Sequence, residues 1–263
     1  MTLTALITGA SQGTGRATAL YFAQRGYDIA IAARSADRLN QVADEIRSLG
    51  RQALAIPTDV SQPDQVAALV EKTLAALGSV DVLINTAGIC LTGPVQSTTL
   101  EDWHQLVDTN FWGYVYTINA LLPHLIERQQ GAIVNVGSFG GKLPLPQMTA
   151  YCASKYAVTG LSESLQVELA QHNIHVALVH PGVINSSFME RAQFRGEGDQ
   201  QARDRMANML KSSWVSQPED IAQAIWQAVV HKRSETVVGP ATLATEAHRL
   251  FPGLTRWALR AAV

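Results

Sequence analysis

Short apolar runs alternate along the chain with longer segments in which apolar residues recur every three or four positions. The apolar runs cover residues 4–8, 29–33, 53–57, 80–85, 132–136, 176–180 and 236–238. Each run is continuous and not alternating, which is typical of parallel strands buried on both faces. The segments between them, such as 35–49 and 64–77, have the 3.6-residue period of amphipathic helices. The pattern predicts an α/β fold: a doubly wound parallel sheet of about seven strands with helices on both faces.

Two segments depart from this alternation within what we expect to be a single domain over residues 1–263. Residues 185–214 are polar and follow a predicted strand, at the edge of the sheet where ligands bind in open α/β folds. We predict that they form a substrate lid, the alternative being a plain surface excursion. Residues 241–263 form a C-terminal extension with apolar positions and scattered arginines. We expect it to pack on its own domain or a neighbouring subunit, the alternative being membrane contact.

Composition excludes several classes of protein. With 47% apolar residues, the chain of 263 residues can bury a large core. A net charge of −2 gives no basic footprint for nucleic acid. Two cysteines suggest no disulfide framework, and the seven histidines do not have metal-ligand spacing. Without a leader pattern or a membrane-length apolar run, we expect a cytoplasmic protein with no metal site and no transmembrane segment.

A glycine-rich turn follows the first predicted strand and opens the next helix. Gly9 allows the tight turn, while Gly13 and Gly15 allow a pyrophosphate to approach the backbone and the helix to pack closely on the strand. The N-terminus of that helix offers free N–H donors and a positive dipole end. A strand, a glycine turn and a helix in this order predict a Rossmann-type dinucleotide site.

The end of the second predicted strand indicates which dinucleotide binds. Folds that prefer NAD usually place an acidic residue there for the ribose 2′-hydroxyl. Here the strand ends in Arg34 and Ser35, Arg38 follows one helical turn later, and Asp28 lies at the strand's start. An arginine can bind a 2′-phosphate with charge-assisted hydrogen bonds. We therefore predict a preference for NADP(H) over NAD(H), the alternative being that Arg34 is a solvated loop residue.

Tyr151 and Lys155 lie four residues apart, thirteen residues after Ser138. On a helix this spacing puts the phenol and the ammonium on one face. A nearby positive charge favours the phenolate form of a tyrosine, which makes the phenol a better proton donor near neutral pH. By itself, such a pair occurs by chance on many helix surfaces, so its meaning depends on the surrounding motifs.

Those motifs resemble the short-chain dehydrogenase/reductase family, over residues from Thr4 to about Gly239. The family's glycine motif matches residues 8–15, its Asp-Val matches 59–60 and its Asn-Asn-Ala-Gly matches 85–88. Its helix asparagine matches residue 110 and its serine matches residue 138. Its Tyr-x-x-x-Lys matches residues 151–155 and its Pro-Gly matches 181–182. The chain departs at Thr86, where the family has asparagine, and at Thr14, where it has an apolar residue. Ser186 stands where the family often has threonine.

The resemblance implies a catalytic set and a cofactor set. The catalytic set is Asn110, Ser138, Tyr151 and Lys155. The cofactor set is Gly9, Ser11, Gly13, Thr14, Gly15, Arg34, Ser35, Asp59, Val60, Asn85, Ala87, Gly88, Tyr151, Lys155, Pro181, Gly182, Ile184 and Ser186. By resemblance, Tyr151 exchanges a proton with the substrate oxygen, Ser138 holds that oxygen, Lys155 also binds the nicotinamide ribose, and Asn110 holds a water that links Lys155 to solvent.

The implied function is interconversion of a ketone or aldehyde and an alcohol, with 3-oxoacyl thioesters and apolar ketones as the nearest substrate classes. Apolar walls for such a substrate are expected from residues 143–148, Cys90–Leu91 and 188–189. Arginines 191, 195, 203 and 205 could meet an acidic carrier. The alternatives are a non-catalytic NADP(H)-binding regulator on the same fold and an enzyme that works towards alcohol oxidation. The family also implies a homodimer or homotetramer, formed through the helices around Asn110 and Tyr151.

Overall fold

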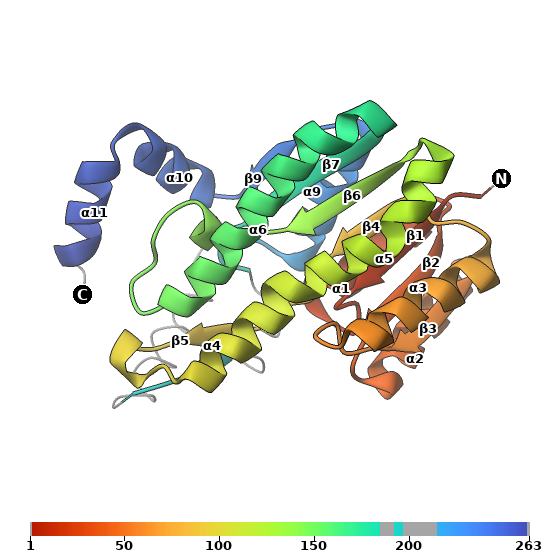
Figure 1. Ribbon diagram of the computed structural model, residues 1–263, viewed down its shortest axis with the longest axis horizontal. Coiled ribbons are helices and arrows are strands. Elements are labelled where there is room, and N and C mark those ends of the chain that lie inside the picture. The colour runs from red at the N-terminus through yellow and green to blue at the C-terminus, as the bar shows by residue number, and fades with distance from the viewer. Residues whose placement is uncertain (1, 185–191, 197–214, 262–263) are drawn as a thin grey trace.

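The computed structural model describes residues 2–184, 192–196 and 215–261 and forms three layers, with a parallel sheet between two layers of helices (Figure 1). Seven strands pair in the order β3-β2-β1-β4-β6-β7-β9, and every neighbouring pair is parallel. Their bounds are β1 Thr4–Thr8, β2 Asp28–Ala33, β3 Ala53–Pro57, β4 Val82–Asn85, β6 Gly131–Val136, β7 Ile174–Pro181 and β9 Glu235–Val238. The Rossmann-type doubly wound sheet expected from the apolar runs is confirmed.

The continuous apolar character of the strands follows from this layering. In β1, Ala5 and Ile7 point into one helical layer and Leu6 into the other, so every position is buried. The first layer contains α1 (Gly13–Ala23), α2 (Ala36–Ser48) and α9 (Pro218–Val230). The second contains α3 (Pro63–Leu77), α5 (Gly113–Arg128) and α6 (Thr149–Glu168).

Helix ends follow local sequence signals. Helix α3 begins at Pro63 and is followed by Gly78 with φ 79°, a backbone region that favours glycine. Helix α4 (Leu100–Val107) begins with a capping box, in which the Thr99 hydroxyl accepts from the Asp102 amide while the Asp102 carboxylate accepts from the Thr99 amide. These local signals explain why the periodic segments 35–49 and 64–77 predict α2 and α3 to within two residues.

A second, smaller sheet has no counterpart in the sequence prediction. Strand β5 (Cys90–Thr92) pairs in parallel with β8 (Ala192–Phe194), so part of the segment predicted as a lid is anchored beside the loop after β4. Arg195 makes two hydrogen bonds to the Asp102 carboxylate, at 3.0 and 2.6 Å, and these hold the pKa of Asp102 below its usual range. Arg195 is thus paired with Asp102, with 35% of its side chain exposed, and its contact with an acidic carrier stays a prediction, while arginines 191, 203 and 205 lie outside the described residues.

The C-terminal extension contains α10 (Ala241–Leu250) and α11 (Pro252–Ala261), which lie at the end of the molecule opposite β2 and β3 (Figure 1). Its large apolar side chains are not buried against the domain: Leu243, Leu250, Phe251, Leu254 and Trp257 are each more than half exposed. The sequence predicts that these side chains pack either on their own domain or on a neighbouring subunit. The structure does not show the first of these arrangements. In the part of the chain that is described, no helix is both long and apolar enough to cross a membrane.

Candidate active site

The glycine turn between β1 and α1 brings three backbone segments into close contact. Gly9 has φ 66°, and a Cβ there would lie 2.8 Å from the backbone of Ala87. A Cβ at Gly15 would collide with the Gly9 carbonyl group and the Thr86 hydroxyl. Gly13 also has a positive φ of 54°. Gly9 and Gly15 therefore let the turn (the glycine cradle) pack against the loop after β4 at the N-terminus of α1, where free N–H groups favour a pyrophosphate.

Thr86, the departure from the family motif, has a structural role in this cradle. Its hydroxyl donates to the Thr8 carbonyl, while the Thr8 hydroxyl accepts from the amides of Thr86 and Ala87 at 3.2 and 3.3 Å. The two threonines therefore tie the carboxyl end of β1 to that of β4. Because Thr8 and Thr86 already bond to each other, an asparagine at position 86 is not needed to hold these two strands together.

The end of β2 is basic. Arg34 is exposed, and among the described residues it forms neither a hydrogen bond nor an ion pair. Arg38 reaches back to the glycine turn and donates to the Gln12 side chain at 2.5 Å. Asp28 lies at the opposite end of the strand, where it binds the Arg51 side chain and the Gln52 amide. The end of β2 itself, at Ala33, Arg34 and Ser35, has no carboxylate for a ribose 2′-hydroxyl, and the exposed Arg34 guanidinium stands there instead.

Other residues assigned to the cofactor lie along the same edge, with different degrees of access. Val60 is buried against α5, where a Cβ at Gly113 would lie 2.8 Å from it. Asn85 is fully buried: its amide donates to the Asn135 side chain at 3.0 Å and accepts from the Thr117 hydroxyl at 2.8 Å. The Asn85 side chain therefore belongs to a network inside the core, and only its backbone is left to contact a ligand.

The remaining assigned residues follow β3, β4 and β7. Asp59 caps its own loop by accepting from the amide and the hydroxyl of Ser61. Gly182 follows β7 and packs against Ala241, since a Cβ there would stand 2.9 Å from the alanine Cβ. Ile184 pairs with Ser216 in an isolated parallel bridge. Ser186 lies outside the described residues, so its predicted contact to a nicotinamide amide stays a prediction.

Ser138 and Tyr151 share Gly140 as a neighbour. Ser138 follows β6 in extended backbone and precedes the short turn η3 (Phe139–Gly141). Its hydroxyl oxygen accepts a hydrogen bond from the Gly140 amide at 3.1 Å. The Tyr151 ring lies against the same glycine, because a Cβ on Gly140 would stand 3.4 Å from ring atom Cε1. With the amide occupying an acceptor position on its oxygen, the Ser138 hydroxyl can direct its proton at another acceptor, such as a substrate oxygen.

Lys155 is a buried cation, with 5% of its surface exposed. Its ammonium group donates to the Val136 carbonyl at the end of β6, at 3.0 Å, and lies 5.4 Å from the centre of the Tyr114 ring. Burial lowers the pKa of Lys155 to about 8, so the ammonium form still dominates at neutral pH. Tyr151 lies one turn away on the same helix, which places a desolvated positive charge close to the phenol.

Asn110 lies in η2 (Asp108–Trp112), a single turn of π-helix between α4 and α5. Its side-chain nitrogen donates to the Ile89 carbonyl at 3.0 Å and to the Ser154 hydroxyl at 3.1 Å, and its oxygen accepts from the Ile89 amide at 2.8 Å. Asn110 thus clamps the loop after β4 to α6, beside Lys155. Single π-helical turns occur frequently at functional sites. The water that Asn110 is predicted to hold stays a prediction.

Apolar side chains cover one side of Tyr151. Leu91, Leu106 and Ala150 are buried in one cluster with the tyrosine ring, and Ile89 and Trp103 pack against it. Cys90 and Leu143 are also buried. Leu91 thus lies buried beside Tyr151, and the part of Cys90–Leu91 in a substrate wall stays a prediction, while residues 188–189 lie outside the described part of the chain.

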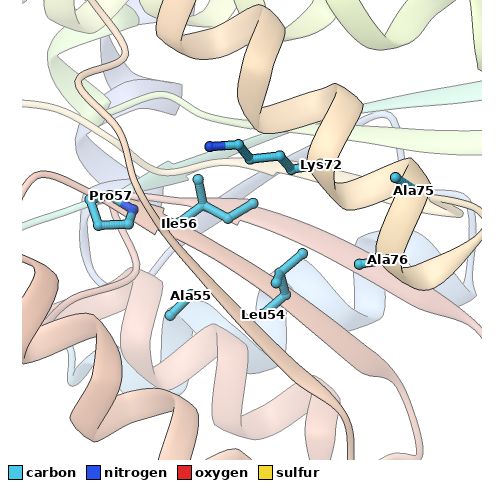
Figure 2. Close-up of a pocket in the computed structure, with 7 residues that line it drawn as sticks. All are labelled: Leu54, Ala55, Ile56, Pro57, Lys72, Ala75 and Ala76. Carbon is cyan, nitrogen blue, oxygen red and sulfur yellow. The ribbon is translucent and has the colours of Figure 1, made fainter.

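A separate apolar groove of about 500 Å³ lies between β3 and α3. Figure 2 shows β3 contributing Leu54, Ile56 and Pro57 and α3 contributing Lys72, Ala75 and Ala76. Lys72 is its only charged lining residue, so the groove has no pair of groups that could exchange a proton. It stands apart from the edge where Ser138, Tyr151 and Lys155 lie.

Sequence reasoning missed two groups at this edge. Tyr114 is buried beneath the site, and its hydroxyl donates to the same Val136 carbonyl that binds Lys155. His180 is fully buried and bonds the Ser138 carbonyl, although its place beside Pro181 suggests simple packing. His180 could have been identified from the sequence, because it is a titratable residue within an otherwise apolar strand. Such a side chain needs hydrogen-bond partners when it is buried.

Comparison with known proteins places this arrangement among dehydrogenases. Residues 3–197 match the family model for short chain dehydrogenase. The chain is 33% identical to the 3-oxoacyl-[acyl-carrier-protein] reductase FabG of Staphylococcus aureus over 226 residues, which cover 86% of this chain and 89% of that protein.

Solved structures agree in fold and differ in the cofactor they contain. A short chain dehydrogenase/reductase from Burkholderia phymatum, in complex with NAD, has a TM-score of 0.87 at 28% identity and covers 95% of both chains. A metagenomic short-chain oxidoreductase, in complex with NADP, has a TM-score of 0.73 at 30% identity, covering 90% of this chain and 96% of that one.

Proposed function

The chain belongs to the short-chain dehydrogenase family of oxidoreductases, and from this premise we propose that it is an NADP(H)-dependent carbonyl reductase. Its substrate would be an apolar ketone or a 3-oxoacyl thioester, reduced to the corresponding alcohol. The observation that carries the proposal is the meeting of Ser138, Tyr151 and the buried Lys155 at the carboxyl edge of the sheet, next to the glycine cradle.

The glycine cradle and Arg34 suit the cofactor. The close packing at Gly9 and Gly15 and the positive φ of Gly13 hold the turn at the N-terminus of α1, a position that favours a pyrophosphate, and Arg34 offers a guanidinium to a 2′-phosphate. When it is bound, such a cofactor supplies the hydride that reduces the carbonyl carbon.

The protein's own groups act on the carbonyl oxygen. The Ser138 hydroxyl, held from behind by the Gly140 amide, donates a hydrogen bond to that oxygen and favours the negative charge that develops on it. Tyr151 then gives its phenolic proton to the oxygen, forming the O–H bond of the alcohol while the tyrosine becomes phenolate. The buried Lys155 ammonium stabilises that phenolate through a low-dielectric surrounding. Both proton and oxygen are therefore handled by residues of β6, η3 and α6.

Cofactor choice can be tested at Arg34. Replacing it with aspartate removes a partner of the 2′-phosphate and adds a repulsive charge, as well as an acceptor for a ribose 2′-hydroxyl. We expect kcat/KM for NADPH to fall about 100-fold, or roughly 3 kcal/mol, and that for NADH to rise. Steady-state kinetics with both cofactors measures this ratio, with Arg25→Asp, just beyond the C-terminal end of α1, as a control. An unchanged ratio in the Arg34 variant would remove the basis for NADP(H).

The substrate class can be tested with a panel of carbonyl compounds followed by NADPH absorbance. The apolar surroundings of Tyr151 lead us to expect turnover of 3-oxoacyl thioesters and apolar ketones well above that of keto acids with several charges. The sequence relative FabG also points to 3-oxoacyl compounds. Faster turnover of the highly charged keto acids would contradict this choice of substrate while leaving the reaction type in place.

A further inference from the structure

His180, at the end of β7, is completely buried and uses both of its ring nitrogens. Nδ1 lies 2.8 Å from the carbonyl oxygen of Ser138, and Nε2 lies 3.1 Å from a carboxylate oxygen of Glu235 on β9. Lys142 donates to the same Glu235 oxygen at 2.5 Å. A chain of hydrogen bonds therefore runs from the surface at Lys142, through Glu235 and His180, to the backbone of Ser138.

Both partners of His180 accept hydrogen bonds. A backbone carbonyl oxygen can only accept, and an ionised carboxylate can only accept. Hydrogen bonds from His180 and Lys142 lower the pKa of Glu235 to about 2. A bond from Nδ1 to the Ser138 carbonyl requires a proton on Nδ1, and a bond from Nε2 to the Glu235 carboxylate requires a proton on Nε2.

The backbone around Ser138 is shaped to receive this ring. A Cβ on Gly137 would lie 2.8 Å from Nδ1 of His180, so the ring occupies the space that a side chain at position 137 would need. The Ser138 carbonyl also accepts from the Gly141 amide at 2.8 Å, which closes the η3 turn. The His180 and Gly141 bonds together fix the Ser138 peptide group, and the Gly140 amide fixes its hydroxyl oxygen.

We propose that His180, held by Glu235, is a positioning residue that sets the orientation of Ser138 for its hydrogen bond to the substrate oxygen. The proposal rests on the proposed function, because it assigns Ser138 a partner in the substrate. It gives the edge strand β9 a part in the geometry of the active site. It also explains why position 137 is glycine in a chain that has histidine at position 180.

Two amide replacements separate the two bonds of His180. The asparagine amide nitrogen takes the place of Nδ1, so His180→Asn keeps a donor to Ser138 and loses Glu235. The glutamine amide nitrogen takes the place of Nε2, so His180→Gln keeps Glu235 and loses Ser138. We expect kcat to fall about 10- to 100-fold in His180→Gln and only a few-fold in His180→Asn, with an unchanged dissociation constant for NADPH in both.

The matched readout is a double-mutant cycle with Ser138→Ala. If His180 acts through Ser138, His180→Gln lowers kcat in the wild-type background and has little further effect on kcat in Ser138→Ala. Two results would overturn the proposal. One is that the losses of kcat from His180→Gln and Ser138→Ala add. The other is that His180→Asn and His180→Gln lose kcat equally, in proportion to their loss of thermal stability. A Ser138→Ala enzyme with wild-type turnover would instead overturn the role of serine in the proposed function.

A measurement that does not depend on enzyme activity tests the inference separately from the proposed function. Nitrogen NMR of histidine-labelled full-length protein at pH 7 should give protonated Nδ1 and Nε2 for His180, with the assignment made from the His180→Gln variant. In Glu235→Gln, the amide replaces the carboxylate, and we expect loss of the Nε2 proton signal at the same pH. A His180 ring without a proton on Nδ1 in the wild-type protein would contradict the inference, whatever the activity.

Discussion

Replacement of Tyr151 by phenylalanine is expected to lower kcat by about 10²- to 10⁴-fold, the range over which general acid catalysis contributes. The variant lacks only the phenolic oxygen, so the ring still packs against Gly140 and the Leu91 cluster. The fold and the affinity for NADPH should therefore stay close to those of the wild-type protein. The measurement is NADPH oxidation with the best ketone of the panel, together with a fluorescence titration of the cofactor.

A matched control lies on the same helix. Tyr156 is 43% exposed, and Tyr156→Phe removes a phenolic oxygen at the surface of α6. We expect this variant to keep wild-type kcat. Turnover within a few-fold of wild type in Tyr151→Phe would show that another group protonates the substrate oxygen, and the assignment of the acid would then be wrong.

Replacement of Lys155 by methionine is expected to abolish most turnover and yet to stabilise the fold at neutral pH. Burial lowers the pKa of the lysine from its usual 10.5 to about 8, so the charged form is disfavoured in the folded protein. A shift of this size corresponds to about 3 kcal/mol. The hydrogen bond to the Val136 carbonyl is lost in the variant and offsets about 1 kcal/mol. A gain of about 2 kcal/mol in unfolding free energy at pH 7 remains.

Because the pKa of Lys155 is lower in the folded protein than in the unfolded chain, the gain in unfolding free energy depends on pH. Below pH 8 the lysine is protonated in both the folded and the unfolded wild-type protein, and the full cost of burying its charge is present. Between pH 8 and 10.5 the unfolded chain binds the extra proton, so wild-type stability rises relative to the variant. Urea unfolding of both proteins at pH 7 and pH 10 measures the difference, with Lys72→Met on the surface of α3 as a control. A Lys155→Met protein less stable than wild type at pH 7 would contradict the cost assigned to the buried ammonium.

The fold was predictable because its signals are local and repeated. Most strands of the main sheet are apolar runs, although β9 begins with Glu235 and Thr236, and segments such as 35–49 and 64–77 have a 3.6-residue period, so the βαβ alternation could be seen without a structure. Strands β5 and β8 could not be predicted in this way. They are three residues each, separated by about a hundred positions, and β8 lies inside a polar segment. Their pairing depends on tertiary contacts such as that of Arg195 with Asp102.

The candidate site was predictable to the extent that motifs carry it. Gly9, Gly15, Ser138, Tyr151 and Lys155 lie together at one edge of the sheet, as their order along the chain and the parallel topology require. The sequence could not predict which other residues these side chains contact. The shared Val136 carbonyl, the role of Thr86 in closing the cradle, and the bond from His180 to Ser138 all join residues far apart in the chain.

Two residues with predicted roles have side chains that already bond other groups of the protein. Asn85 matches the family motif, but its side chain is fixed within the core by Asn135 and Thr117. Arg195 lies in the charged segment considered for carrier binding, but its guanidinium is paired with Asp102. In both cases the residue type fits the predicted role, and the partners that satisfy it are visible only in three dimensions.

The central claim is that this edge of the sheet supports reduction of a carbonyl group, with a hydride delivered to carbon and a proton to oxygen. The most direct measurement uses NADPH deuterated on the transferable position of its nicotinamide ring and the best ketone of the panel, with mass spectrometry of the product. We predict an alcohol carrying one deuterium on the carbinol carbon, formed at no more than about 1% of the wild-type initial rate when Tyr151→Phe replaces the wild-type protein. Failure to form labelled alcohol from any ketone or thioester of the panel, by a folded protein that binds NADPH, would contradict the claim.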